Sequence, residues 1–357
     1  MTDKRSTMDD TGQDSTGSRT QVVVLGAGTM GAGIAQCLAD HGRDVTLTDI
    51  DTDALKRAQD RIAASRSHLE TAGLQTSDAS IEGDQRLNTS TDLAESLATA
   101  DLVIEAVPEN IELKCQVFAE LDRLAPPHTA LVSNTSGLSI TTLGQATRRP
   151  EQVAGFHWWN PAELVPLVEV TSGDQTDPQL IEQLLELAVE LGKQPIHVRR
   201  DVPGFVGNRL QFAVFREALH LIEQGVVSPE DLDRAMTGGP GFRWGFLGPL
   251  QAADFGGLDV FHSISSYLWQ DLSDATTAPA ALTDRLDAGR LGTKTQGGFY
   301  EYSADSLAEL TQRRDRFLLG LKQLVEQTGA PSCLTTPNQT PAPHFSTAPQ
   351  PRSPRGT

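Results

Sequence analysis

A histidine and a glutamate twelve residues apart, His157 and Glu169, are the side chains of this chain best suited to acid–base chemistry. His157 follows the apolar run Val153–Phe156, and Glu169 lies near the end of the run Val165–Val170. We expect both runs to be strands of one sheet, so that the two side chains meet at its edge. A carboxylate that accepts a hydrogen bond from one imidazole nitrogen leaves the other nitrogen free as a base. Such a base can take the proton of a secondary alcohol while hydride leaves the same carbon, whereas the alternative is a hydrogen-bonded structural histidine.

A glycine turn near the start of the chain predicts what accepts the hydride. The segment Gly26–Gly31 reads GAGTMG between a β-branched run and a helical pattern, and a second apolar run ends in Asp49. This order of strand, glycine turn, helix, strand and acid is the dinucleotide-binding fingerprint. We expect Gly26 to permit the tight turn, Gly28 to let a pyrophosphate approach, and Gly31 to let the helix pack closely on the strand.

The residues around this turn predict NAD as the cofactor. The helix that follows offers free N–H groups to the phosphates, so Thr29 and Met30 are predicted cofactor contacts. A carboxylate at Asp49 accepts hydrogen bonds from the ribose hydroxyls and repels a 2′-phosphate. Ile50 follows Asp49, and no arginine stands in the next few positions to favour NADP. The alternative is that Asp49 only caps a turn.

Alternating strand and helix patterns from Gln21 to about Arg200 predict an α/β fold, a Rossmann-like doubly wound parallel sheet. The predicted strands are Gln21–Leu25, Val45–Thr48, Leu102–Ala106, Ala130–Ser133, Val153–Phe156 and Val165–Val170. The predicted helices between them include Gly31–His41, Thr52–Ala72 and Ile111–Leu124. Residues 73–90 are expected to form a loop or an exposed hairpin.

The pattern changes near Pro203, after which only helices are expected. They are predicted at Phe205–Gln224, Ser228–Met236, Leu258–Leu268 and Asp305–Glu326. The predicted organisation is a disordered tail at 1–20, a nucleotide-binding domain at 21–200, a helical domain at 201–328 and a second disordered tail at 329–357.

The composition narrows the class of protein. A net charge of −18 argues against nucleic acid and anionic membranes as partners, and no apolar run is long enough to span a bilayer. Three scattered cysteines form neither a metal site nor a disulfide framework, which favours the cytoplasm. Only six of the 29 basic residues are lysines, against 47 acids, and this balance suggests a halophilic surface. A GC-rich genome that favours arginine is the alternative explanation.

Seven segments in one order resemble the L-3-hydroxyacyl-CoA dehydrogenase family over about 21–302. They are GAGTMGAGIAQ at 26–36, EAVPENIELK at 105–114, SNTS at 133–136, HWWNP at 157–161, LVEV at 167–170, PGFVGNRL at 203–210 and KTQGGFY at 294–300. The resemblance implies an NAD-binding α/β domain, an all-α C-terminal domain that forms a homodimer, and an active site in the cleft between them. The implied substrate is an L-3-hydroxyacyl-CoA.

The resemblance also implies roles for individual residues. His157 matches the general base and Glu169 its orienting carboxylate. Ser136 and Asn160 match groups around the substrate's 3-oxygen and the imidazole, and Asn208 matches a polar residue from the helical domain. The contacts implied for the nicotinamide riboside half of NAD are Glu109, Lys114 and Asn134. A solvated lysine at 114 and a helix cap at 208 are the structural alternatives.

Two departures from the family pattern bear on the substrate. Trp158 and Trp159 stand where Phe-Phe is common, and they either narrow the acyl pocket or pack in the core. Arg57, Arg61 and Arg66 stand where lysines often lie near the CoA phosphates, and they either bind phosphate or are solvated charges. A related dehydrogenase of a free hydroxy acid or alcohol, of the carnitine, gulonate or pyridine-carboxylate type, is the alternative enzyme. A non-catalytic, crystallin-like NAD-binding protein is the alternative from another class.

Overall fold

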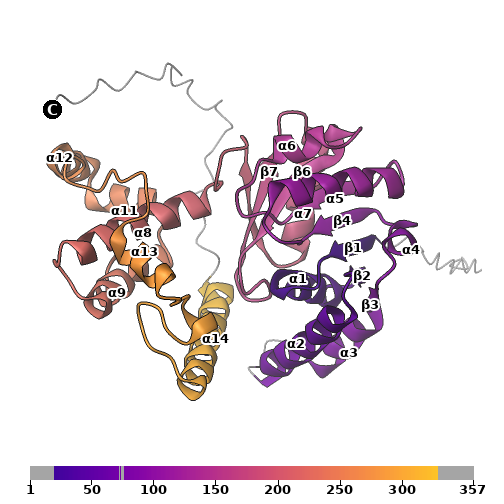
Figure 1. The fold of residues 1–357 in the computed structure, drawn as a ribbon, viewed down its shortest axis with the longest axis horizontal. Helices are drawn as coiled ribbons and strands as arrows, with labels where there is room; N and C mark the ends of the chain where they lie inside the picture. The colour runs from indigo at the N-terminus through magenta and orange to yellow at the C-terminus, as the bar shows by residue number, and fades with distance from the viewer. Residues whose placement is uncertain (1–19, 72, 74–75, 329–357) are drawn as a thin grey trace, which may run out of the picture.

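The computed structural model describes residues 20–71, 73 and 76–328 (Figure 1). The predicted disordered tails therefore lie outside the described residues, apart from Thr20.

One eight-stranded sheet, in the order β3-β2-β1-β4-β5-β6-β7-β8, forms the frame of the N-terminal half. Its strands are β1 (Gln21–Leu25), β2 (Asp44–Thr48), β3 (Leu87–Ser90), β4 (Leu102–Glu105), β5 (Ala130–Ser133), β6 (Val153–Trp158), β7 (Leu167–Ser172) and β8 (Gln194–Val198). All neighbouring strands are parallel except β6 and β7. Parallel strands place their carboxyl ends at one edge, where open α/β sheets bind ligands.

Helices cover both faces of this sheet, which explains why its central strands are continuously apolar. They are α1 (Thr29–Asp40), α2 (Thr52–Thr71), α3 (Ser77–Arg86), α4 (Leu93–Leu97), α5 (Ile111–Leu124), α6 (Ile140–Gln145) and α7 (Pro178–Glu190), with a short 3₁₀ turn at Pro150–Gln152. One core cluster joins Ile34 of α1 and Leu184 of α7 to the sheet, and a second joins Phe118 of α5 and Leu143 of α6 to it. The predicted doubly wound α/β architecture is confirmed.

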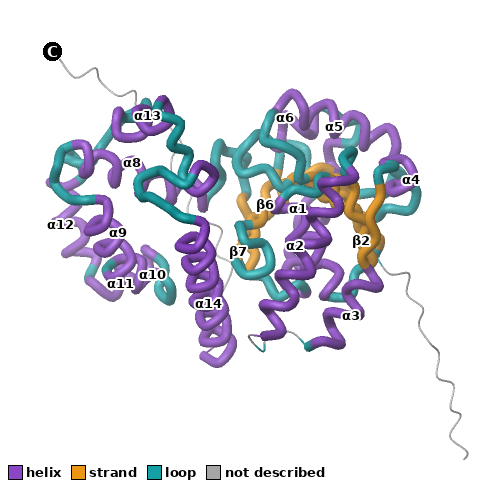
Figure 2. Tube along the Cα trace, turned by 60° about the horizontal axis from the view of Figure 1, so that its bottom comes forward, coloured by secondary structure: helices purple, strands orange, loops and turns teal. Residues whose placement is uncertain are grey.

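The C-terminal half is helical apart from its loops, as Figure 2 shows. Its helices are α8 (Gly207–Glu223), α9 (Pro229–Gly238), α10 (Pro240–Trp244), α11 (Pro249–Gly256), α12 (Leu258–Leu268), α13 (Ala280–Asp287) and α14 (Ala304–Thr328), with a 3₁₀ turn at Thr293–Thr295. No helix in the described ranges is long and apolar enough to cross a membrane.

Three features of the sheet differ from the prediction. Within 73–90, the expected loop or hairpin is helix α3 followed by strand β3, which pairs in parallel with β2. β3 reads LNTS because it is a partly exposed edge strand and needs no apolar run. The second edge strand, β8, was also not predicted. The third difference is that β7 runs antiparallel to β6, so the sheet is not wholly parallel.

Candidate active site

The glycine turn between β1 and α1 is built by close backbone contacts. Gly26 has a φ of +108°, and a Cβ there would lie 2.7 Å from the Ala106 carbonyl oxygen. A Cβ at Gly31 would lie 1.8 Å from the Gly26 carbonyl oxygen, so only glycine lets α1 begin so close to β1. A Cβ at Gly28 would meet no atom within 4 Å. The space beside Gly28 is therefore open to a phosphate, as the fingerprint requires.

The N-terminus of α1 faces this space. Gly28 is the N-cap, no side chain caps the helix, and its first turn contains no acid. The N–H groups of the first turn, including those of Thr29 and Met30, can therefore bind an anion. This cradle fits the pyrophosphate of a dinucleotide.

Asp49 lies directly after β2 and contacts the same turn. Its Oδ2 accepts a hydrogen bond from the Ala27 N–H at 2.7 Å, and its Oδ1 accepts one from the Asp51 N–H at 3.0 Å. A carboxylate has about four acceptor positions, so both oxygens can still accept hydrogen bonds from ribose hydroxyls. The Asp49 carboxylate thus supports the loop and remains able to bind a ribose.

The antiparallel pairing of β6 and β7 places His157 directly opposite Glu169. The His157 Nδ1 lies 2.8 Å from Glu169 Oε2, and both side chains are buried. Because β7 begins at the edge where β6 ends, Glu169 meets His157 from the third position of β7 rather than from its end. This hydrogen bond defines the tautomer with a proton on Nδ1, which leaves Nε2 as the free acceptor.

Glu169 also accepts hydrogen bonds from the start of α8. The Val206 and Gly207 N–H groups each donate to its Oε1 at 3.0 Å. Burial raises the pKa of Glu169, but the hydrogen bonds from His157, Gly207 and Val206 together hold it below its ordinary value of 4.5. The carboxylate therefore stays ionised and serves both the histidine and the first helix of the helical domain.

Ser136, Glu109 and Asn208 meet where the two domains approach each other. Glu109 Oε1 accepts hydrogen bonds from the Thr135 hydroxyl at 2.7 Å and the Ser136 N–H at 2.9 Å. The Asn208 amide donates to the Ser136 carbonyl at 2.8 Å. Asn208 therefore connects α8 to the loop after β5 and is not a cap of its own helix.

The linker between the domains passes close to this loop. A Cβ at Gly137 would lie 2.5 Å from the Gly204 nitrogen, so the two segments need glycine where they cross. The next residue, Phe205, has a φ of 48° and is fully buried, with its ring centroid 5.9 Å from that of His157. Positive φ values are unfavourable for a bulky residue, so packing against the histidine must hold this conformation.

Lys114 is not a solvated helix residue. Its ammonium lies 2.6 Å from Glu105 Oε1 and 3.5 Å from Glu109 Oε2, and it donates to the Val107 carbonyl at 3.1 Å. The side chain of Lys114 is only 1% exposed. Glu109 thus connects this buried ion pair to Ser136.

The two remaining predicted site residues differ in their surroundings. The Asn134 Oδ1 accepts a hydrogen bond from the Trp158 N–H at 2.8 Å, which connects the ends of β5 and β6. Asn160 follows β6, is exposed, and makes no side-chain hydrogen bond within the described part of the chain. Both lie at the carboxyl edge of the sheet. The functional roles of all these residues stay predictions.

The two tryptophans have different environments. Trp158 is 1% exposed and packs edge-on against Phe156, with ring centroids 5.5 Å apart. The Trp159 Nε1 lies 3.3 Å from Glu169 Oε2, and its ring centroid lies 5.4 Å from that of His157. Trp158 is therefore core packing, whereas Trp159 belongs to the site.

The three arginines of α2 do not form a phosphate site together. Arg66 is buried and pairs with Asp40 and Asp84. Arg66 is therefore not a phosphate ligand, because these two carboxylates already compensate its charge. Arg57 pairs with Asp51 at 3.2 Å on the surface, and Arg61 is exposed.

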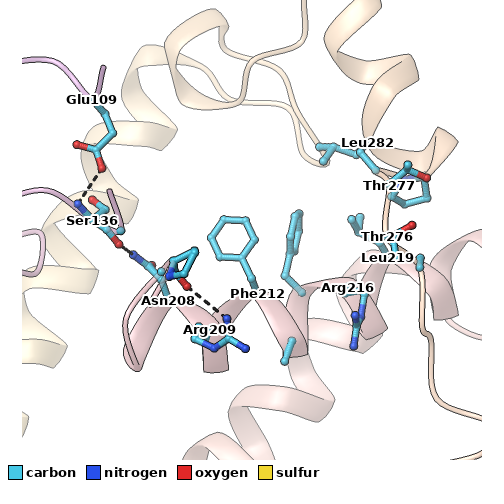
Figure 3. Close-up of a pocket in the computed structure, with 18 residues that line it drawn as sticks. Glu109, Ser136, Asn208, Arg209, Phe212, Arg216, Leu219, Thr276, Thr277 and Leu282 are labelled. Atoms are coloured by element: carbon cyan, nitrogen blue, oxygen red, sulfur yellow. Dashed lines mark hydrogen bonds between the residues drawn. The ribbon is translucent and has the colours of Figure 1, made fainter. Parts of the chain in front are cut away.

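A cavity of about 740 Å³ adjoins the cluster of Glu109, Ser136 and Asn208, and most of its lining residues belong to the helical domain. Glu109, Ser136 and Asn208 form one end, and Thr276 and Thr277 lie at the other. Figure 3 shows Phe212 projecting from α8 between these two ends. His157 is not among the lining residues.

The sequence prediction lacks one residue of this site, Glu105, and one contact, between Trp159 and Glu169. Glu105 is buried at the end of β4, accepts a hydrogen bond from the Ser133 hydroxyl at 2.6 Å, and neutralises Lys114. An acid inside the apolar run of a central strand is a sequence signal that could have found it. The contact of Trp159 with Glu169 has no such signal, because it depends on the rotamer of the indole.

Comparisons with known proteins agree with this arrangement. The family model described as 3-hydroxyacyl-CoA dehydrogenase, NAD binding domain, matches residues 21–202, and its C-terminal domain matches residues 204–302. A 5-formyl-3-hydroxy-2-methylpyridine 4-carboxylate 5-dehydrogenase from Mesorhizobium japonicum is 35% identical over 305 residues, 85% of this chain and 98% of that protein. A probable 3-hydroxybutyryl-CoA dehydrogenase from Bacillus subtilis is 38% identical over 283 residues, 79% of this chain and 97% of that protein.

A solved structure matches most of the chain. The crystal structure of a 5-formyl-3-hydroxy-2-methylpyridine 4-carboxylic acid 5-dehydrogenase, described as an NAD⁺-dependent dismutase, matches with a TM-score of 0.81. It is 34% identical, and the match covers 87% of this chain and 99% of that one. The predicted cofactor, NAD, is confirmed by this likeness and by the NAD-binding family match. The chain therefore belongs to the 3-hydroxyacyl-CoA dehydrogenase family of NAD-dependent oxidoreductases.

Proposed function

We propose that this protein oxidises the 3-hydroxyl of an L-3-hydroxyacyl-CoA to the 3-ketoacyl-CoA, with His157 as the general base. The observation that carries the proposal is the hydrogen bond from His157 Nδ1 to Glu169 at 2.8 Å. It leaves Nε2 with no hydrogen-bond partner in the described structure, at the edge of the sheet that the glycine turn also reaches. A base in this state and place suits a secondary alcohol.

Each side chain of the site has a separate proposed role in the reaction. His157 Nε2 takes the proton of the 3-hydroxyl, and Glu169 stabilises the imidazolium that forms. Bound NAD supplies the acceptor for the hydride that leaves the same carbon. Ser136 and Asn160 are proposed to hold the 3-oxygen, and Asn208 closes the site from the helical domain.

The proposed cofactor contacts lie along the same carboxyl edge of the sheet. We propose that Gly26–Gly31 and Asp49 hold the adenosine and pyrophosphate, and that Glu109, Lys114 and Asn134 contact the nicotinamide riboside. The open space beside Gly28 supports the first assignment. The position of Glu109 between Lys114 and Ser136 supports the second, because it lies between the buried ion pair and the proposed substrate group.

We also propose that the protein is a cytoplasmic homodimer whose helical domains form the interface. Large apolar side chains are between 60% and 80% exposed on these helices, namely Phe212, Phe242, Phe255, Tyr267 and Trp269. A single chain in water rarely leaves so many aromatics uncovered. The free thiols of Cys37 and Cys115 agree with a reducing compartment.

A free hydroxy acid or related carboxylate is the second candidate substrate. The observation in its favour is the extent of the likeness to the pyridine-carboxylate dehydrogenase, which covers 85% of this chain. For a free hydroxy acid, His157 and Glu169 keep their roles, and only the group beyond the reacting carbon differs. A formyl group must first add water, and His157 would then take a hydroxyl proton of the hydrate as hydride leaves the same carbon.

A side-by-side NADH assay at high salt tests both candidates. Acetoacetyl-CoA and free acetoacetate are offered with NADH, and 5-formyl-3-hydroxy-2-methylpyridine 4-carboxylate is offered with NAD⁺. We expect acetoacetyl-CoA to be reduced fastest, and His157→Gln to lower the rate by orders of magnitude with NADH binding nearly intact. His128→Gln, at an exposed histidine, is the control. Turnover of only a free acid would favour the second candidate, and no turnover beside normal NADH binding would exclude both.

A further inference from the structure

Trp159 contacts both the proposed catalytic pair and the first turn of α8. Its indole N–H donates to Glu169 Oε2 at 3.3 Å, and the same oxygen lies 2.8 Å from His157 Nδ1. Glu169 Oε2 therefore has two donors, one from His157 near the end of β6 and one from Trp159 directly after it. A carboxylate oxygen fixed by two donors has less freedom to rotate than one held by a single donor.

The indole ring also depends on a glycine in the helical domain. A Cβ at Gly207 would lie 2.3 Å from Trp159 Cζ2 and 3.1 Å from Cη2. The Gly207 N–H donates to the other oxygen of Glu169 at 3.0 Å. Glycine at 207 thus lets the indole and the backbone of α8 approach the same carboxylate from two sides.

We infer that Trp159 is a positioning residue that fixes Glu169, and through it His157, against the start of α8. The inference rests on the proposed role of His157 as the base. A phenylalanine in place of Trp159 would keep an aromatic ring but lose both the N–H and the part of the ring that packs on Gly207. The carboxylate would then be held on one oxygen by His157 alone and on the other by the helix.

The neighbouring tryptophan provides a matched control. Trp158 packs in the core, and its Nε1 has no hydrogen-bond partner in the described part of the protein. Replacing each tryptophan in turn by phenylalanine removes the same atoms from the chain. Only the change at Trp159 removes a donor to Glu169. Comparing the two variants therefore separates the effect of lost packing from the effect of lost positioning.

The first test compares Trp159→Phe with Trp158→Phe in turnover. We expect Trp159→Phe to lower kcat about tenfold with little change in KM, because a hydrogen bond to a charged group is lost. In the pH–rate profile of Trp159→Phe, the fall in rate on the acid side (the acid limb) should occur at a higher pH than in the wild type. With one donor fewer, the negative charge of Glu169 is less compensated, so it favours a positive charge on the neighbouring imidazole more strongly. Trp158→Phe should lower the melting temperature and leave the acid limb in place. An acid limb that Trp159→Phe does not move would overturn the inference.

A second readout does not require turnover. The low-field proton NMR signal of the His157–Glu169 hydrogen bond, identified by its loss in His157→Gln, should move in Trp159→Phe and stay in Trp158→Phe. An unchanged position in Trp159→Phe would count against the inference. If the wild-type protein turned over none of the substrates, the proposed function would fail, and this signal would still decide the role of Trp159.

A double-mutant cycle tests the contact itself. Gly207→Ala should lower the melting temperature in the wild-type background, because its methyl group meets the indole. In the Trp159→Phe background, where Cζ2 is absent, the same change should cost much less. Equal losses in both backgrounds would show that the indole does not pack on Gly207, and the inference would be wrong.

Discussion

Glu105 and Lys114 form an ion pair inside the sheet domain, with 2.6 Å between Glu105 Oε1 and Lys114 Nζ, and neither side chain is more than 1% exposed. Glu105 Oε2 accepts from the Ser133 hydroxyl, and Lys114 also donates to the Val107 carbonyl. Neighbouring protein groups thus hold both members of the pair. Such pairs are sensitive to the loss of one member, because the other is left as an uncompensated buried charge.

Lys114→Met should therefore destabilise the protein by about 3–5 kcal/mol, measured by urea unfolding. The double variant Glu105→Gln/Lys114→Met should lose less, since no buried charge remains. Lys56→Met, at an exposed lysine of α2, is the control and should stay within about 0.5 kcal/mol of the wild type. A Lys114→Met protein as stable as the control would contradict the buried pair.

Alanine substitutions at Gly28 and Gly31 should have different effects. A Cβ at Gly28 meets nothing within 4 Å, and the residue has a φ of −68°, so Gly28→Ala should fold normally. It should weaken NADH binding, because the methyl group fills the space of the phosphates. Gly31→Ala should lower the melting temperature, because its Cβ would overlap the Gly26 carbonyl. NADH titration and thermal unfolding measure the two effects, and tight NADH binding by Gly28→Ala would argue against this phosphate site.

The stability of the protein should fall in acid partly through Glu169. The pKa of Glu169 is held below its ordinary value of 4.5, so between the two values the unfolded chain binds more protons than the folded one. The contribution of this carboxylate is present above pH 4.5 and is lost as the pH falls through the folded pKa. The stability gap between wild type and Glu169→Gln should therefore narrow below that pH.

Urea midpoints measured from about pH 7 down to about pH 3 test this expectation. Glu186→Gln, at an exposed glutamate of α7, is the control and should follow the wild type throughout. A gap for Glu169→Gln that stayed constant with pH would show that the carboxylate does not titrate as described.

Salt should stabilise the protein if its acidic surface is an adaptation to high salt. The net charge is −18, and screening by molar salt shortens the range of self-repulsion to about 3 Å. We expect the melting temperature to be clearly higher in molar KCl than in dilute buffer. Equal melting temperatures in the two solutions would favour genome composition as the reason for the few lysines.

The strands of the nucleotide-binding half were predictable where they are buried on both faces. β1 and β5 have the predicted bounds, because an apolar run surrounded by turn residues leaves little choice. β3 and β8 lie at the two edges of the sheet, where one side is unpaired and the apolar signal is weak. An edge strand forms because it pairs with a strand that is distant in sequence, and the residues of the edge strand itself do not reveal that partner.

The sequence was enough to predict most residues of the site, but not the contacts between them. His157 and Glu169 follow from the ends of apolar runs, but the reversal of β7 that sets them opposite each other is a property of the whole sheet. The burial of Lys114 required Glu105 on another element, and the bond from Trp159 required a particular orientation of its indole. Contacts of this kind come from tertiary packing.

The placement of His157 and Glu169 on neighbouring strands of one sheet has an evolutionary consequence. Both side chains belong to the nucleotide-binding half, whereas the cavity at Ser136 is lined largely by α8 and residues 275–282. Substitutions in these lining segments, away from the Val206 and Gly207 N–H groups that bind Glu169, can therefore reshape the cavity without rebuilding the strand pair. A lineage built in this way can vary the cavity while inheriting the hydrogen-bonded pair of His157 and Glu169 intact.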